Sequence, residues 1–309
     1  MFWLQEKAAE AAGHAEKAQE HAEHVPIIVK YVNQYFGHWA YDFEMKYTYP
    51  FWKGFLAKFG STPEAAFGPY TPENAIPWYT VMFVIACILS LAIIFLFTRR
   101  LSAEDPSYGQ QTLEIGVLAV RDMLQDIVGP HGLKYFPMVM TFAVLILVSN
   151  LMGLFPLFMS PTSATSVTFA LGLSSFLYYN GVGIKENGLF GHLKHFAGPI
   201  WWIAPLIFPI EVISNFIRPF SLGIRLFGNM FADEKVLETI AHLAPPWSSF
   251  GVPVLLMPLS VFVAFIQTFV FILLSQLYLS EVSHAPHDSH AEHHYDEDLS
   301  EEFIVPILT

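Results

Sequence analysis

The strongest constraint on the fold is a long apolar stretch, residues 211–234, that carries two arginines well inside its length. On a helix that turns ~100° per residue, nearly all of its polar side chains fall within about 40° of Arg225. Leu, Ile, Phe and Met cover the remaining surface. A charged side chain at the bilayer centre costs ~2.5–3.5 kcal/mol even on a lenient insertion scale. The polar stripe must therefore face water, a protein partner or a conduction path, and lipid is excluded.

This stripe also supplies the first candidate site residues. Its members besides Arg225 are Glu211, Ser214, Arg218, Ser221 and Asn229. Fourteen positions, or about 21 Å along a helix, separate Glu211 from Arg225, which is too far for an ion pair. The other expected spans carry no acid inside the membrane, so we expect the counter-ion of Arg225 to belong to another subunit. Arg218 lies nearer the inner end, where a long side chain can reach the interface.

The composition places this stretch in a membrane protein. Of the 309 residues, 54% are apolar and only 14% are charged, which is typical of a polytopic membrane protein rather than a soluble domain. The single cysteine, Cys87, excludes a disulfide within one chain. No basic patch with interleaved aromatic residues points to nucleic acid.

The first 74 residues are expected to form an amphipathic, interfacial segment. Residues 1–25 have no apolar run behind a basic start, so they are not a cleaved signal peptide and should form a solvated helix or a disordered tail. Residues 26–37 are too short a segment to span a bilayer. The density of Trp, Tyr and Phe in residues 38–70 suits the membrane–water interface.

The membrane domain is expected to cover residues 75–282. Its five apolar segments lie at about 78–98, 136–158, 165–184, 203–242 and 252–281. The last two would reach about 60 and 45 Å as helices, more than the hydrocarbon thickness, and a short link joins them. The fold class is therefore all-α and polytopic, with five transmembrane helices, of which the last two form a long tilted hairpin. An amphipathic helix at 110–128 should lie on the inner surface.

Positive charge sets the expected orientation. Arg99 and Arg100 follow the first span, and Lys185 and Lys194 follow the third. The positive-inside rule puts all four on the cytoplasmic side, so the amino terminus lies outside and the carboxyl terminus inside. The tail at 283–309 is rich in His and acidic residues, which favours a disordered solubilising tail over metal capture.

An acidic pair marks the outer end of the polar stripe. Asp233 and Glu234 lie beyond Arg225, on the side opposite Glu211. If both ends line aqueous pockets, Arg225 separates two water-filled routes. An ordinary solvated helix end is the alternative for the pair.

Three polar residues on other spans are candidates for the same region. Ser260 and Gln267 are seven positions apart and share one face of the last span, and Asn150 lies in the second span. Gln267 is the natural hydrogen-bond partner for the stripe on the adjacent helix, and a simple helix–helix contact is its alternative. Asn150 either joins the outer pocket or caps a turn.

Residues 219–230, PFSLGIRLFGNM, resemble the signature of subunit a of the F-type ATP synthase membrane sector. Supporting similarity lies in NLMGLFP at 150–156, PTSATSVT at 161–168 and QTFVFILLSQLYLS at 267–280. The resemblance extends over most of residues 75–282 and leaves out the first 70 residues and the tail.

The resemblance implies a mechanism. Members of this family stand beside a rotating ring of small hairpin subunits, each with one membrane carboxylate. The essential arginine of the family falls on Arg225, which attracts the ionised ring carboxylate and blocks a direct leak between two offset half-channels. The implied partners are the ring of c subunits, subunit b of the peripheral stalk, the other synthase subunits and the lipid of a bacterial plasma membrane. No cofactor, metal or nucleotide chemistry is assigned to this chain, so it is not an enzyme by itself.

The same resemblance distributes roles along the proton path. Glu211 would line the inner exit, and Asn229, Glu234 and Gln267 would line the outer route or position the arginine. Many bacterial relatives have a histidine where this sequence has Ser260. The pair formed by Asp233 and Glu234 would then supply the outer relay, as in plastid-type relatives.

Two other classes of function stay open at this point. A secondary transporter that binds an anionic substrate at Arg225 would carry paired repeats and broken helices at the midplane, and neither is evident. A membrane scaffold would use its arginines only to pair with partners.

Overall fold

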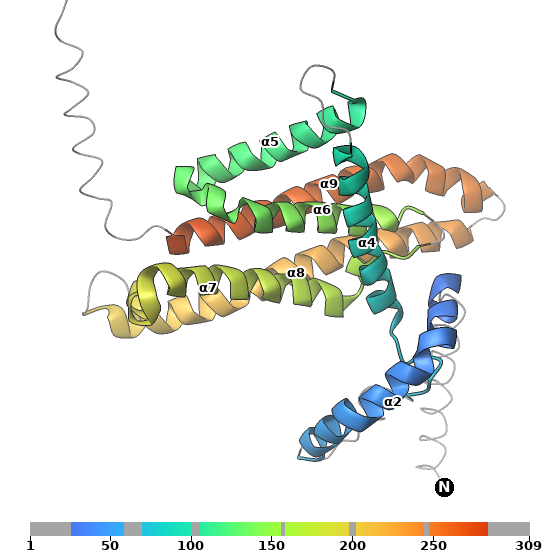
Figure 1. Ribbon diagram of the computed structural model, residues 1–309, viewed down its shortest axis with the longest axis horizontal. Helices are drawn as coiled ribbons and strands as arrows, with labels where there is room; N and C mark the ends of the chain where they lie inside the picture. Colours follow the sequence, from blue (N-terminus) through green and yellow to red (C-terminus); the bar gives the residue numbers. More distant parts are fainter. Residues whose placement is uncertain are drawn as a thin grey trace, which may run out of the picture.

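The computed structural model describes residues 26–58, 70–99, 106–155, 158–197, 202–243 and 247–283, and these contain helices and turns but no strand (Figure 1). Five helices in these ranges are long and apolar enough to cross a membrane. They are Trp78–Thr98, Pro130–Met152, Thr165–Gly188, Pro205–Leu237 and Val254–Ser283. The expected fold class, an all-α polytopic membrane protein, is thereby confirmed. The amino-terminal 25 residues and the tail from residue 284 lie outside the described ranges.

In the described ranges, one helix precedes the spans. α2 (Ile27–Ala57) is 31 residues long and runs through the position where the sequence pattern suggested a boundary, near Gly37. Gly37 lies against the segment before the first span, where an added Cβ would stand 2.1 Å from the Pro72 carbonyl oxygen, so the close approach requires glycine. Asn33 also joins α2 to this segment: its amide donates to the Ile76 carbonyl at 3.0 Å and its oxygen accepts from the Ile76 N–H at 2.9 Å.

The middle of α2 makes a second contact with the same segment. The Tyr70 hydroxyl donates to the Glu44 carboxylate, and the ring of Tyr70 stacks on Tyr41 with the ring centres 5.1 Å apart. Burial and the hydrogen bond to Glu44 raise the pKa of Tyr70. These contacts fix α2 at the end of the chain segment that enters the first span.

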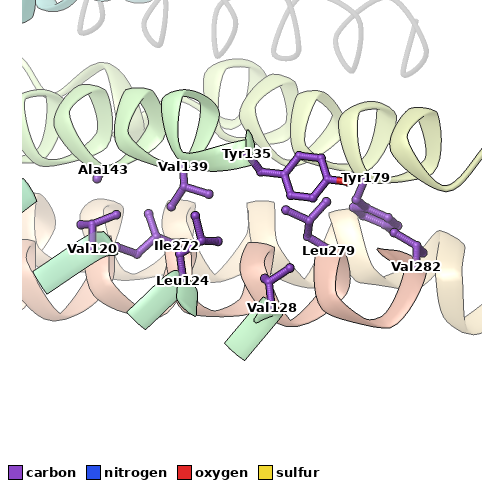
Figure 2. Close-up of a cluster of buried hydrophobic side chains, with 10 residues drawn as sticks. All are labelled: Val120, Leu124, Val128, Tyr135, Val139, Ala143, Tyr179, Ile272, Leu279 and Val282. Atoms are coloured by element: carbon purple, nitrogen blue, oxygen red, sulfur yellow. The ribbon is translucent and has the colours of Figure 1, made fainter. Parts of the chain in front are cut away.

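A buried apolar cluster holds the later helices together (Figure 2). α5 (Tyr108–Val128) presents its apolar face to α9 (Trp247–Ser283), and η1 (Pro130–Tyr135) and α6 (Phe136–Met152) close the cluster. The side chains involved are Val120, Leu124, Val128, Tyr135, Val139, Ala143, Tyr179, Ile272, Leu279 and Val282. Their burial explains why the amphipathic α5 lies along the bundle instead of crossing it.

The remaining helices carry the polar stripe. α7 (Thr165–Ala197) continues beyond the expected end at Ile184 and bends at Gly188, whose φ of 71° lies in the left-handed region that favours glycine. α8 (Ala204–Leu243) is 40 residues long and stays helical through Pro209 and Pro219. It packs mainly against α7 and α9. In Figure 1, α4 (Trp78–Thr98) stands at a steep angle to α6, α8 and α9, so the α8–α9 hairpin is strongly inclined to the first span.

Candidate functional site

Arg225 lies on the exposed side of α8. Leu222 and Leu226, its neighbours on the buried side, are only 2% and 0% exposed, whereas Ser221 and Asn229, one turn on either side of Arg225, are exposed with it. Arg225 makes no ion pair or hydrogen bond with any residue in the described ranges. The guanidinium is therefore available to a group outside this chain.

The exposed surfaces of α8 and α9 are largely apolar. Ile213, Ile217 and Ile224 on α8 are each more than half exposed, and so are several large side chains of α9. The exposed α9 residues include Val254, Leu255, Leu259, Phe262, Phe265 and Phe269. An apolar face of this extent suits lipid or a partner, but the charged group within it excludes lipid alone as its cover.

A groove lies on the side of Arg225 that faces the start of α8. It has a volume of about 400 Å³ and is lined by Ile210, Ile213, Ser214, Ile217, Arg218, Ser221 and Tyr278. Two predicted site residues, Ser214 and Ser221, thus share one groove. Because Ser221 lies one helical turn before Arg225, the groove leads to the arginine.

Arg218 lines this groove and is fully paired. Its terminal nitrogens donate to both oxygens of Glu281, at 2.6 and 2.9 Å, and one of them also donates to Glu211 at 3.3 Å. Its guanidinium carbon lies 5.0 Å from the centre of the Tyr278 ring. The structure thus places Glu211 in an ion pair with Arg218, which lines the groove, and holds Arg218 within the hairpin. Sequence reasoning missed Glu281, because an acid at the end of a span reads as a solvated residue.

Glu234 is held on the other side of Arg225, against the connection between α6 and α7. Its carboxylate accepts the Ser160 N–H at 3.2 Å, next to η2 (Pro161–Ser163). The Ser160 hydroxyl donates to the Ser149 carbonyl at 3.0 Å and lies 2.7 Å from the Thr162 hydroxyl. Through this backbone N–H, Glu234 is tied to the segment that carries these hydroxyl groups instead of lying in free solvent.

Asn150 joins the same cluster. Its side-chain oxygen accepts from the Thr162 hydroxyl at 2.7 Å, and Asn150 is only 3% exposed. The Asn150 amide nitrogen and the Ser149 hydroxyl are buried and have no hydrogen-bond partner among the described residues. Buried polar groups of this kind are normally satisfied by ordered water. The cluster therefore has the polarity of a hydrated site.

The last two helices bring together four further predicted residues. The Asn229 amide donates to the Gln267 side-chain oxygen, one turn beyond Arg225. The Ser260 hydroxyl donates to Asp233 at 3.0 Å. Both α9 members are almost fully buried. The neighbouring acids diverge on α8, since Asp233 bonds to α9 and Glu234 bonds to the segment before α7.

A third polar group was not predicted. The Tyr179 hydroxyl donates to the Asn215 side-chain oxygen at 2.7 Å, and the Asn215 amide donates to Asn180 at 3.0 Å. This group links α7 to α8. It lies near the groove, because the Tyr179 ring contacts Tyr278, which lines the groove. The presence of a tyrosine and two asparagines in largely apolar helices was the feature of the sequence that could have indicated this group.

The five long apolar helices in the described ranges define the class of all-α polytopic membrane proteins. Residues 80–280 match the family model described as ATP synthase A chain. The ATP synthase subunit a of Trichlorobacter lovleyi is 45% identical over 206 residues, which cover 67% of this chain and 85% of the relative. The chain belongs to the ATP synthase A chain family.

Other curated relatives give the same result. The ATP synthase subunit a of Geobacter sulfurreducens is 43% identical over 196 residues, or 63% of this chain and 82% of the relative. The ATP synthase subunit a of Koribacter versatilis is 40% identical over 219 residues, or 70% of this chain and 87% of the relative. α2 lies outside the region that the family model matches.

Proposed function

We propose that this chain is the stator half of a proton-driven rotary motor and that Arg225 faces the carboxylates of a ring of c subunits. The single observation that carries the proposal is the contrast between two arginines on α8. Arg218 is paired with Glu211 and Glu281, whereas Arg225 is exposed on an apolar face and has no partner in the described part of the chain. An unpaired cation at membrane depth requires a counter-ion, and a ring carboxylate supplies it.

The inner half-channel follows the groove on α8. Ser214 and Ser221 line it, and Glu211 accepts a hydrogen bond from Arg218, which also lines it. Hydroxyl groups can bind water and pass protons along hydrogen bonds. A proton released by the ring beside Arg225 would leave through this groove.

The outer half-channel follows the cluster around Glu234. Asn150, Ser160 and Thr162 connect it to the segment between α6 and α7. Asp233 with Ser260, and Asn229 with Gln267, extend the polar surface along the hairpin toward Arg225. Arg225 lies between the two routes and blocks a proton from passing directly from one to the other, because a fixed cation repels it.

The remaining assignments rest on family membership and charge. The chain would sit in a bacterial plasma membrane with its amino terminus outside and its carboxyl terminus in the cytoplasm. Its partners would be the c-ring, subunit b of the peripheral stalk, the other synthase subunits and lipid. Nucleotide chemistry would belong to other subunits of the complex.

Arg225→Ala tests the proposal in membranes that carry the whole complex. We expect assembly to be retained and ATP-driven proton pumping to be lost. Arg121→Ala, which removes an exposed arginine of α5, is the matched control and should pump normally. Coupled pumping by Arg225→Ala would contradict the proposal, and loss of the assembled complex would favour a scaffold.

A further inference from the structure

Arg218 is shared unequally between two carboxylates. It donates to both oxygens of Glu281, at 2.6 and 2.9 Å, but to only one oxygen of Glu211, at the longer distance of 3.3 Å. A two-point contact between a guanidinium and one carboxylate is stronger and more specific than a single bond. Glu281 is therefore the main partner of Arg218, and Glu211 is the minor one.

Tyr278 reinforces this preference. The guanidinium carbon of Arg218 lies 5.0 Å from the centre of the Tyr278 ring, in cation–π range, and Tyr278 belongs to the same helix as Glu281. The Arg218 side chain is only 16% exposed, whereas the Glu281 side chain is 39% exposed, so water screens this contact in part. α9 therefore holds the guanidinium on its own side of the groove.

The group carries one surplus negative charge. One arginine faces two carboxylates, and among the described residues the titratable side chains in contact with this group are Tyr278 on α9 and Tyr179 on α7, which contact each other. The nearby His192 of α7 bonds to Asn180 at 3.2 Å. Tyrosines are neutral near neutral pH. Glu281 accepts two of the three hydrogen bonds of the guanidinium, including the two shortest. The surplus negative charge therefore falls mainly on Glu211.

We propose that Glu281 is a positioning residue of the inner proton route: it retains Arg218 on α9 and so leaves Glu211 available to exchange protons at the end of the groove. The inference rests on the proposed function, because it names working parts of the inner half-channel. Without the Glu281 carboxylate, Arg218 turns to Glu211. Pairing with a cation favours the charged form of a carboxylate, so Glu211 then takes up protons less readily.

The test uses inverted membrane vesicles that contain the whole complex, because the pH of the medium then sets the proton supply to the inner face. At each pH, the rate of ATP-driven proton pumping is divided by the rate of uncoupled ATP hydrolysis, so that changes in hydrolysis alone do not affect the profile. For Glu281→Gln we expect the proton concentration that gives half-maximal pumping to rise about tenfold or more. Glu281→Asp keeps a carboxylate and should shift the profile less, in the same direction.

Two further variants sharpen the test. Glu186→Gln removes the carboxylate of another pair between chain segments, with Lys134, away from the groove, and should leave the pH profile unshifted. The double variant Glu211→Gln with Glu281→Gln should match Glu211→Gln alone, because Glu281 acts through Glu211.

Two results would overturn the inference. One is an unchanged profile in Glu281→Gln, and the other is a reduction by the same factor at every pH, which indicates a merely structural role. If the complex with Glu281→Gln does not assemble, Glu281→Asp provides the test, and an unshifted pH profile in that variant would also overturn the inference. These outcomes differ from failure of the proposed function, which would appear as coupled pumping in Arg225→Ala.

Discussion

Gly172 of α7 and Pro219 of α8 meet backbone to backbone: a Cβ added at Gly172 would stand 2.6 Å from the Pro219 carbonyl oxygen. On the opposite helix, a Cβ at Gly223 would lie 3.2 Å from the Thr168 carbonyl oxygen. Gly172 and Gly223 thus let α7 and α8 approach closely near Arg225, as small residues do in membrane helix pairs. The two glycines of the family signature therefore differ in their surroundings. Gly223 packs against α7, whereas Gly228 has open space around it.

Gly172→Val should separate α7 from α8 and destabilise the assembled complex. Forcing atoms into a close-packed contact costs ~1–3 kcal/mol, and here the obstacle is backbone that cannot move aside. Thermal dissociation of the detergent-solubilised complex measures the effect. Gly181→Val is the matched control on the same helix, because its Cβ meets nothing within 4 Å. Equal stability of the two variants would argue against this contact.

Glu234→Gln should slow proton uptake from the outer side. The amide keeps the oxygen that accepts the Ser160 N–H but cannot cycle between charged and neutral forms. A positioned proton-transfer group contributes ~10²–10⁴-fold to a rate, so the loss in ATP synthesis driven by an imposed gradient should be large. Uncoupled ATP hydrolysis should be unaffected. Wild-type synthesis rates at every outer pH would remove Glu234 from the path.

Tyr70 should lose its proton only well above the usual range for tyrosine. Burial and the Glu44 carboxylate raise its pKa in the folded protein. Its contribution to stability is therefore complete below the unfolded value of about 10 and declines as the pH rises above it. Absorbance of tyrosinate, compared between wild type and Tyr70→Phe, isolates this group. Half-titration near pH 10 would show that the contact of Tyr70 with α2 is absent in solution.

The helical spans were the most predictable part of the fold. Long apolar runs such as residues 78–98 leave the backbone no other way to satisfy its hydrogen bonds in lipid. The sequence pattern did not reveal that Ile27–Ala57 form one helix, because the packing of Gly37 against Pro72 is a tertiary contact that leaves no periodic signal. The bend at Gly188 is local, since its φ of 71° lies in the left-handed region that favours glycine and an added Cβ would meet nothing within 4 Å. The extension of α7 beyond this bend was also missed.

Candidate site residues could be grouped on one face, but their partners could not be assigned. Helical periodicity places Glu211, Arg218 and Arg225 on a shared stripe, yet the choice of Glu281 for Arg218 depends on the register between α8 and α9. The contact of Glu234 with Ser160 likewise depends on how η2 folds. Such long-range contacts are set by packing geometry and leave no periodic signal in the sequence.

The central claim is that the exposed face of α8 around Arg225 touches the ring. Two variants are made in a Cys87→Ser background. Ser221→Cys places a thiol on the exposed side of α8, and Leu222→Cys places one at the next position, on the buried side. Each is combined with a cysteine beside the membrane carboxylate of the ring subunit, and disulfide formation is measured in native membranes. The account predicts cross-linking at Ser221→Cys and none at Leu222→Cys. Cross-linking that is absent at Ser221→Cys, or equal at both positions, would contradict it.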